Sequence, residues 1–108
     1  MSIRYLSIVA GVALALSGAL AHADERVVTQ KNKSFSDKTV KLKVGDSIKF
    51  VNDDSFAHNV FSLSDTKSFD LGTYSKGGVK SVTFDKPGTV EVECAIHPDM
   101  KMTVEVSK

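Results

Sequence analysis

Short segments in which apolar and polar residues alternate follow one another from residue 27 to the C-terminal end of this 108-residue chain. Residues 90–94 run Val-Glu-Val-Glu-Cys, and residues 102–106 run Met-Thr-Val-Glu-Val. A period of two places one set of side chains on a buried face and the other in water, which is typical of half-buried β-strands. No helical period follows residue 24. The pattern therefore predicts an all-β domain.

The strands are expected to be short and separated by turns. Gly45-Asp46 and Lys86-Pro87-Gly88 have the composition of tight turns, and residues 64–78 predict a loop-rich connection. About seven such strands favour a small antiparallel β-sandwich of Greek-key type. The alternating lysines and glutamates are interpreted as its solvated face. The expected strands lie around residues 27–28, 40–44, 48–50, 57–63, 79–84, 90–94 and 102–106.

The first 23 residues have the pattern of a secretory signal peptide. Arg4 precedes an apolar run from Tyr5 to Leu20, and Ala21-His22-Ala23 is a small-x-small cleavage site. The alternative is a membrane anchor, but the run is at the short edge of the roughly 17–25 residues that a spanning helix needs. We therefore expect cleavage after residue 23, a domain from 24 to 108, export to a bacterial periplasm and no stable membrane association afterwards.

The composition after residue 23 excludes some classes of function. All 13 acidic residues and 13 of the 14 basic residues lie there, so the net charge of this part is zero. This balance offers no basic surface for nucleic acid. The chain has one cysteine, Cys94, which cannot form an internal disulfide, and a free thiol in an oxidising compartment needs an explanation. It is either a buried, inert apolar residue or a metal ligand.

Metal-binding side chains gather in the segment Cys94–Met102, which holds a thiol, an imidazole and thioethers within one turn. Without residues 1–23 the chain keeps two histidines, one cysteine and two methionines, and His58 is the only one outside this segment. Two His, one Cys and a weakly bound Met are the ligands of copper electron-transfer sites. Zinc could use the same His and Cys, but a thioether is a poor zinc ligand and copper binds such a site more tightly.

Four segments carry a family resemblance: Gly45–Asn52, His58-Asn59-Val60, Phe84–Gly88 and Cys94–Met102. Together they are similar to the cupredoxins, or type 1 blue copper proteins, and most similar to the group of amicyanin, pseudoazurin and plastocyanin. The likeness spans nearly all of the chain after residue 23. It implies a cupredoxin-like sandwich that binds one type 1 copper ion.

The resemblance also implies roles for individual residues. His58, Cys94 and His97 correspond to the equatorial copper ligands, and Met100 to the axial one, with Met102 as the alternative axial ligand because it matches a longer His-to-Met spacing.

Around these ligands, the family implies that the backbone N–H of Asn59 donates to the Cys94 sulfur. Many members have a hydroxyl residue after the cysteine, which bonds to the asparagine side chain; Ala95 predicts that this brace is missing.

The functional prediction is a periplasmic electron carrier that exchanges single electrons with transient redox partners, a donor and an acceptor, and acts as a monomer rather than an enzyme. The edge of the His97 ring would be the electron port, within a docking rim formed by His97, Pro98, Ile96 and Phe56. The alternative is a copper-trafficking or storage protein. A copper enzyme would need a second, histidine-rich centre, and the two histidines after residue 23 leave none for it.

Overall fold

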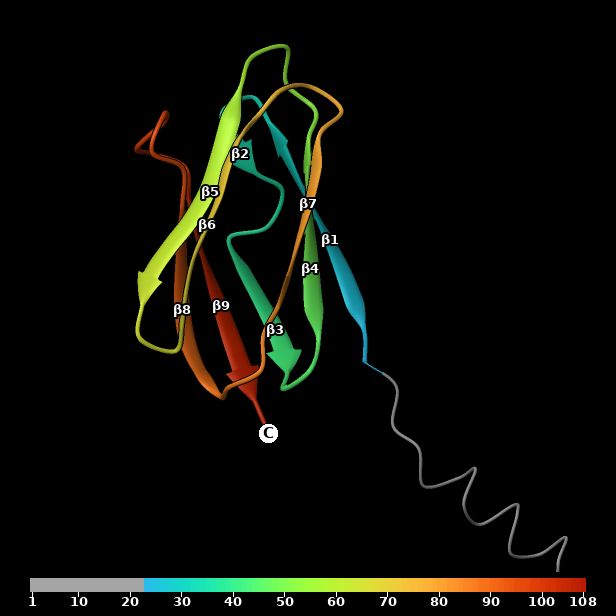
Figure 1. Ribbon diagram of the computed structural model, residues 1–108, viewed down its shortest axis with the longest axis vertical. Helices are drawn as coiled ribbons and strands as arrows, with labels where there is room; N and C mark the ends of the chain where they lie inside the picture. Colours follow the sequence, from blue (N-terminus) through green and yellow to red (C-terminus); the bar gives the residue numbers. More distant parts are fainter. Residues whose placement is uncertain (1–22) are drawn as a thin grey trace, which may run out of the picture.

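The computed structural model describes residues 23–108, which form a sandwich of two β-sheets (Figure 1). The predicted leader lies outside the described residues except for Ala23. Among residues 23–108, no helix has the length and apolar character needed to cross a membrane. The strands are β1 (Glu25–Lys31), β2 (Ser34–Phe35), β3 (Thr39–Lys43), β4 (Ser47–Asn52), β5 (His58–Ser64), β6 (Lys67–Tyr74), β7 (Val79–Thr83), β8 (Gly88–Glu93) and β9 (Lys101–Ser107).

The predicted β-sandwich is confirmed, and its sheets are mixed rather than purely antiparallel. One sheet has the strand order β2-β1-β4-β7 and the other has β3-β9-β8-β5-β6. The pairs β1–β4 and β3–β9 run parallel, whereas the remaining pairs are antiparallel. The parallel pairs arise because the chain leaves the first sheet after β2, forms β3 in the second sheet, and returns to the first sheet as β4.

The prediction of a loop over residues 64–78 is wrong, because β6 occupies eight of these residues and pairs with β5. β6 is an edge strand with one partner, and apart from the buried Tyr74 its inward side chains are only partly buried. Phe69 and Leu71 pack against the core. The rings of Phe69 and Phe84 meet edge to face, with their centroids 6.3 Å apart. Gly72 interrupts the strand with a φ of 75°, and this weakens the apolar pattern that sequence analysis depends on. The two-residue strand β2 was also not predicted.

The core lies between the sheets and consists of the inward-facing residues of the alternating segments. Burying each such side chain contributes about 1.5–3 kcal/mol relative to leaving it in water. Cys94 continues the phase of Val90 and Val92 and is 1% exposed, so its sulfur faces the interior as the pattern predicts. The fully buried apolar residues are Val28, Ile48, Phe50, Val60, Val90, Val92 and Val104.

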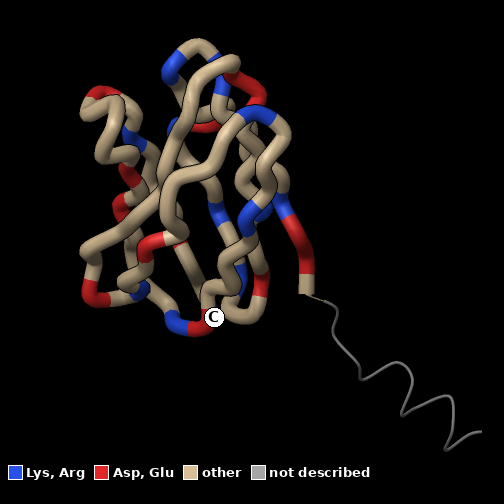
Figure 2. Tube along the Cα trace, turned by 45° about the horizontal axis from the view of Figure 1, so that its top comes forward, with Lys and Arg blue, Asp and Glu red and all other residues tan. Residues whose placement is uncertain are grey.

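The two ends of the sandwich differ. The upper end in Figure 1 holds the β4–β5 loop (residues 53–57), the β8–β9 loop (residues 94–100) and the β1–β2 turn. At the lower end the β3–β4 turn, which contains Gly45 and Asp46, lies beside the start of β1. Figure 2 shows that acidic and basic residues are interspersed over the molecule, without one large patch of a single sign.

Candidate metal centre

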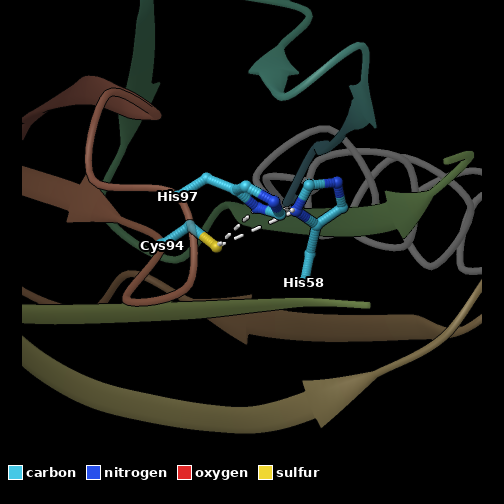
Figure 3. A group of neighbouring side chains, drawn as sticks. All are labelled: His58, Cys94 and His97. Carbon is cyan, nitrogen blue, oxygen red and sulfur yellow. Dashed lines mark hydrogen bonds between the residues drawn. The ribbon is translucent and has the colours of Figure 1, made fainter. Parts of the chain in front are cut away.

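Three donor atoms from separate parts of the chain converge at the upper end. His58 begins β5, Cys94 follows the last residue of β8, and His97 lies in the β8–β9 loop. The Cys94 Sγ lies 3.8 Å from the His58 Nδ1 and 3.9 Å from the His97 Nδ1, and the two Nδ1 atoms are 3.1 Å apart. Figure 3 shows the two rings and the thiol directed at one another. His58 and Cys94 are buried and His97 is half-buried.

Asn52 explains why His58 begins its strand at this place. This buried side chain donates from Nδ2 to the carbonyls of Phe56 and Tyr74 at 3.0 and 2.9 Å, and its Oδ1 accepts the Asp54 N–H at 2.8 Å. The β4–β5 loop is therefore folded around one amide. Because every atom of that amide is used, the loop returns the chain into the second sheet with the His58 ring facing inward.

The β8–β9 loop is closed at its base by backbone hydrogen bonds. Met100 N–H donates to the His97 carbonyl at 2.9 Å, and Cys94 N–H donates to the Met100 carbonyl at 3.3 Å. Ala95 has no hydroxyl to bond to the Asn59 side chain, as predicted. The backbone N–H of Ala95 makes the connection instead, because it donates to the Asn59 Oδ1 at 2.7 Å. A backbone donor does not depend on the side chain, so the loop is tied to β5 without a hydroxyl.

The donor triangle fits one metal ion. Metal bonds of about 2.0–2.1 Å to imidazole nitrogen and about 2.3 Å to thiolate sulfur, the values for zinc, place an ion inside a triangle with sides of this length. The donors are two imidazole nitrogens and one soft sulfur, and two of the three residues are buried. Such a set suits a borderline or soft cation rather than magnesium or calcium, which prefer oxygen ligands.

The two methionines lie at different depths below this triangle. β8 pairs with β9 so that Glu93 faces Lys101 and Val92 faces Met102. Met100 is therefore level with Cys94, to which it is also hydrogen-bonded through the backbone, whereas Met102 lies two residues further into the core. Both side chains are buried, at 1% and 2% exposure.

Residues 23–107 match the model of a family described as copper binding proteins of the plastocyanin/azurin family. The chain belongs to this family. The resemblance stated from the sequence is thereby confirmed, and copper is the metal that the centre binds.

Relatives and solved structures agree with this. The chain is 33% identical over 106 residues to the methylamine utilization protein MauL of Methylorubrum extorquens, covering 97% of this chain and 93% of that protein. A reduced amicyanin variant superposes with a TM-score of 0.72 at 25% identity, over 83% of this chain and 88% of that one. A copper-containing nitrite reductase from Thermus scotoductus SA-01 superposes at 0.73 and 27% identity, over 78% of this chain but only 22% of the reductase chain.

In this cupredoxin, one residue of the centre was missed by the sequence analysis. Asp54 is 6% exposed, and its Oδ2 accepts a hydrogen bond from His58 Nε2 at 2.6 Å. Burial opposes the charge of this carboxyl, but the hydrogen bond from His58 and those from the Asn32 and Lys33 N–H groups outweigh it and lower the pKa of Asp54. The sequence shows Asp54 only as an aspartate in a turn, and aspartates in turns are mostly exposed.

The half-buried ring of His97 lies among groups that disfavour its protonated form. Burial, the neighbouring His58 ring and the Lys33 ammonium all lower the pKa of His97, while Asp54 acts in the opposite direction. Metal ligation requires a neutral imidazole. The surroundings of His97 therefore favour the ligating form.

The predicted rim residues lie together around His97. Phe56 and Ile96 are 39% and 47% exposed, and Pro98 is exposed beside them. The Phe56 ring lies 5.3 Å from the His97 ring and 5.4 Å from the His58 ring. Lys33, which the sequence analysis did not single out, places its Nζ 5.7 Å from the Phe56 ring centroid. The surface beside His97 is thus apolar, with one cation, Lys33, and one anion, Asp99, at its margin.

Proposed function

We propose that this protein is a periplasmic electron carrier with one type 1 copper centre, formed after removal of residues 1–23. The equatorial ligands are His58, Cys94 and His97. The observation that carries the proposal is the convergence of one sulfur and two Nδ1 atoms within 3.9 Å, in a chain of a copper-binding family. Copper held there supplies reversible one-electron chemistry between Cu(I) and Cu(II).

Met100 is the proposed axial ligand. Its backbone lies opposite that of Cys94, at the level of the donor triangle. Met102 is two residues deeper, a displacement of roughly 7 Å along the strand, and lies beside Val92 in the core. This register supports Met100 over Met102.

The protein's own contribution is a rigid and dry ligand set. His58 and Cys94 are fixed by β5, β8 and their hydrogen bonds, so little of the centre has to move between oxidation states. His97 presents the only half-exposed ligand ring, and the apolar rim of Phe56, Ile96 and Pro98 lets a partner approach it closely. A small apolar contact suits partners that bind and leave quickly.

The same geometry argues against copper trafficking and against catalysis. Two of the three donors are buried, which supports retention of the metal rather than transfer to another protein. No second histidine-rich cluster accompanies the centre among residues 23–108, and we propose that the protein transforms no substrate. Since the relative MauL is named for methylamine utilization, we propose that its redox partners serve amine oxidation and that it meets them as a monomer.

The test is a titration of purified residues 24–108 with Cu(II), followed by optical and EPR spectroscopy. We expect one equivalent to produce an intense visible band from thiolate-to-copper charge transfer, which disappears on reduction and returns on oxidation. A trafficking protein would instead reduce or release the ion. A colourless one-to-one complex would contradict the proposal.

A further inference from the structure

Asp54 is a buried carboxylate whose oxygens are both committed to hydrogen bonds. Its Oδ1 accepts the Asn32 N–H at 2.7 Å, and its Oδ2 accepts the Lys33 N–H at 3.2 Å and the His58 Nε2 at 2.6 Å. Asn32 and Lys33 have φ angles of 55° and 56°. Positive φ at both residues is typical of a two-residue type I′ hairpin turn, and here both N–H groups of the turn donate to Asp54. The turn thus forms an anion site occupied by Asp54.

We propose that Asp54 is a positioning residue that fixes His58 in its ligating form and lowers the reduction potential of the copper centre. This inference rests on the proposed function. A neutral imidazole carries one N–H, and a proton bonded at Nε2 leaves the lone pair of Nδ1 directed at the donor triangle. The carboxylate places a negative charge against the ring that binds the metal, which favours Cu(II) over Cu(I). Partners of ligating histidines commonly act in this way.

The turn gains a role through the same contact. Asn32 and Lys33 reach Asp54 through their backbone N–H groups, and these hydrogen bonds keep the carboxylate charged in a buried place. The β1–β2 turn therefore influences the metal without supplying a ligand. The neighbouring Asp53 offers a contrast, because it is half-buried and forms an ion pair with Lys31 at 3.2 Å rather than a bond to a ligand.

The experiment compares the reduction potentials of Asp54→Asn and Asp53→Asn with that of the wild type. Each variant removes one negative charge, and the two positions are adjacent in the sequence. We expect Asp54→Asn to shift the Cu(II)/Cu(I) preference about tenfold toward Cu(I), which is a rise of about 59 mV for one electron, and Asp53→Asn to shift it by less than a third of that. Equal shifts in the two variants, or none in Asp54→Asn, would overturn the inference.

A second measurement needs no variant. In the Cu(I) form of the wild type, nitrogen NMR should show a slowly exchanging proton on the Nε2 of His58. A His58 that lacks this proton, or that is protonated at Nδ1, overturns the inference even if Asp54→Asn fails to fold. If the wild type forms no blue centre, the proposed function fails instead, so the two failures are distinguishable.

A different observation, at the lower end, carries a second inference. The Asp24 N–H donates to the Asp46 Oδ1 at 2.9 Å, and the Asp24 carbonyl accepts the Ser47 N–H at 3.0 Å. The other oxygen of Asp46 accepts the Lys43 N–H at 2.9 Å, and Asp46 is 7% exposed. Asp24 is the residue that directly follows the Ala21-His22-Ala23 cleavage motif, and both Ala23 and Asp24 are exposed.

We infer that leader removal creates an ion pair between the new N-terminus and Asp46. A leader peptidase adds water across the Ala23–Asp24 peptide bond, so that Ala23 gains a carboxylate oxygen and the Asp24 nitrogen becomes an α-ammonium. That nitrogen already lies within bonding distance of Asp46. A hydrogen bond between two charged groups is roughly twice as strong as a neutral one. Cleavage at this bond therefore stabilises the start of β1.

The test is a cycle of four proteins: chains that begin at Asp24 or at Ala23, each with Asp46 or with Asp46→Asn. We expect the Asp24 chain to have the higher thermal midpoint, and the difference to disappear with Asp46→Asn. The same difference in both backgrounds would overturn the inference, as would an exported protein whose mass shows another N-terminus. If Asp46→Asn does not fold, the pKa of the α-amino group is compared between the two chains. A higher pKa in the Asp24 chain than in the Ala23 chain supports the ion pair, and equal values overturn the inference.

Discussion

Asp54 and Asp46 lie at opposite ends of the sandwich and are the two buried carboxylates among residues 23–108. Each accepts two backbone N–H groups, and each fastens one end of β1: Asp46 holds Asp24 before the strand, and Asp54 holds Asn32 after it. Asp54 differs in one partner, the imidazole of His58. The comparison teaches that a carboxylate flanking β4 becomes part of a metal centre when a ligand ring donates to one of its remaining lone pairs.

The largest expected effect is the loss of the copper centre at the upper end, with the lower end unchanged. Cys94→Ser should abolish the visible band of the copper complex completely, because no sulfur remains for charge transfer. Absorption spectra of the Cu(II)-loaded protein measure this. Asp46→Asn is the matched comparison at the lower end and should retain the band at full intensity. A blue Cys94→Ser protein would refute the ligand assignment.

A smaller effect separates the two methionines. Met100→Gln should lower the reduction potential by about 59 mV or more, a tenfold change in Cu(II)/Cu(I) preference, because an amide oxygen is a harder ligand than a thioether. Met102→Gln should instead destabilise the fold by about 1–3 kcal/mol, since it buries an amide in the core, and leave the potential close to that of the wild type. Redox titration and chemical denaturation give the two values. The reverse result would assign the axial position to Met102.

Asp46, at the lower end, should contribute to the acid stability of the protein. The hydrogen bond from the Asp24 N–H, and then that from the Lys43 N–H, lower the pKa of Asp46 from its ordinary 3.8. A lowered pKa in the folded state gives stability that is fully present above pH 3.8 and is lost as the pH falls through the lowered value. Denaturation at a series of pH values should show this loss in the wild type and a flatter profile in Asp46→Asn. Identical profiles would contradict the assignment.

The smallest effect tests whether the β1–β2 turn acts through its backbone. Lys33→Gln removes the exposed cation beside Phe56 but keeps the N–H that reaches Asp54. We expect a stability loss of about 0.5–1 kcal/mol, the range for an exposed cation–π contact, and a potential shift well below that of Asp54→Asn. Unfolding curves and redox titration check both. A larger potential shift than in Asp54→Asn would place the influence of the turn in its side chain.

Most of the metal-binding side chains could be predicted from the sequence, because residues of these types are scarce in it. With a single cysteine and two histidines after residue 23, the alternating phase of Val90, Val92 and Cys94 was enough to direct the thiol inward. The gathering of Phe56, Ile96 and Pro98 around His97 also followed, since three of these four residues are neighbours in one loop. Local signals of this kind do not require knowledge of which strands pair.

What escaped the sequence analysis depends on contacts between distant segments. The bond between Asp54 and His58 exists because the β1–β2 turn, more than twenty residues upstream, supplies the N–H groups that keep a buried carboxylate charged. β6 was missed because an edge strand with a glycine has a weak apolar pattern. The parallel pairs were missed because alternation fixes which face a residue takes but not the direction of its neighbour.

The parallel pairing of β3 with β9 has a consequence for the order of assembly. It joins residues 39–43 to residues 103–107, which are remote from them in the sequence. Pairings between such remote segments form slowly, since a long loop must close first. The second sheet cannot be completed until β9 has inserted between β3 and β8, and the Cys94–Met100 loop lies directly before β9. The centre therefore takes shape only when this long-range pairing has formed, and the chain has no finished site for a metal until β9 is in place.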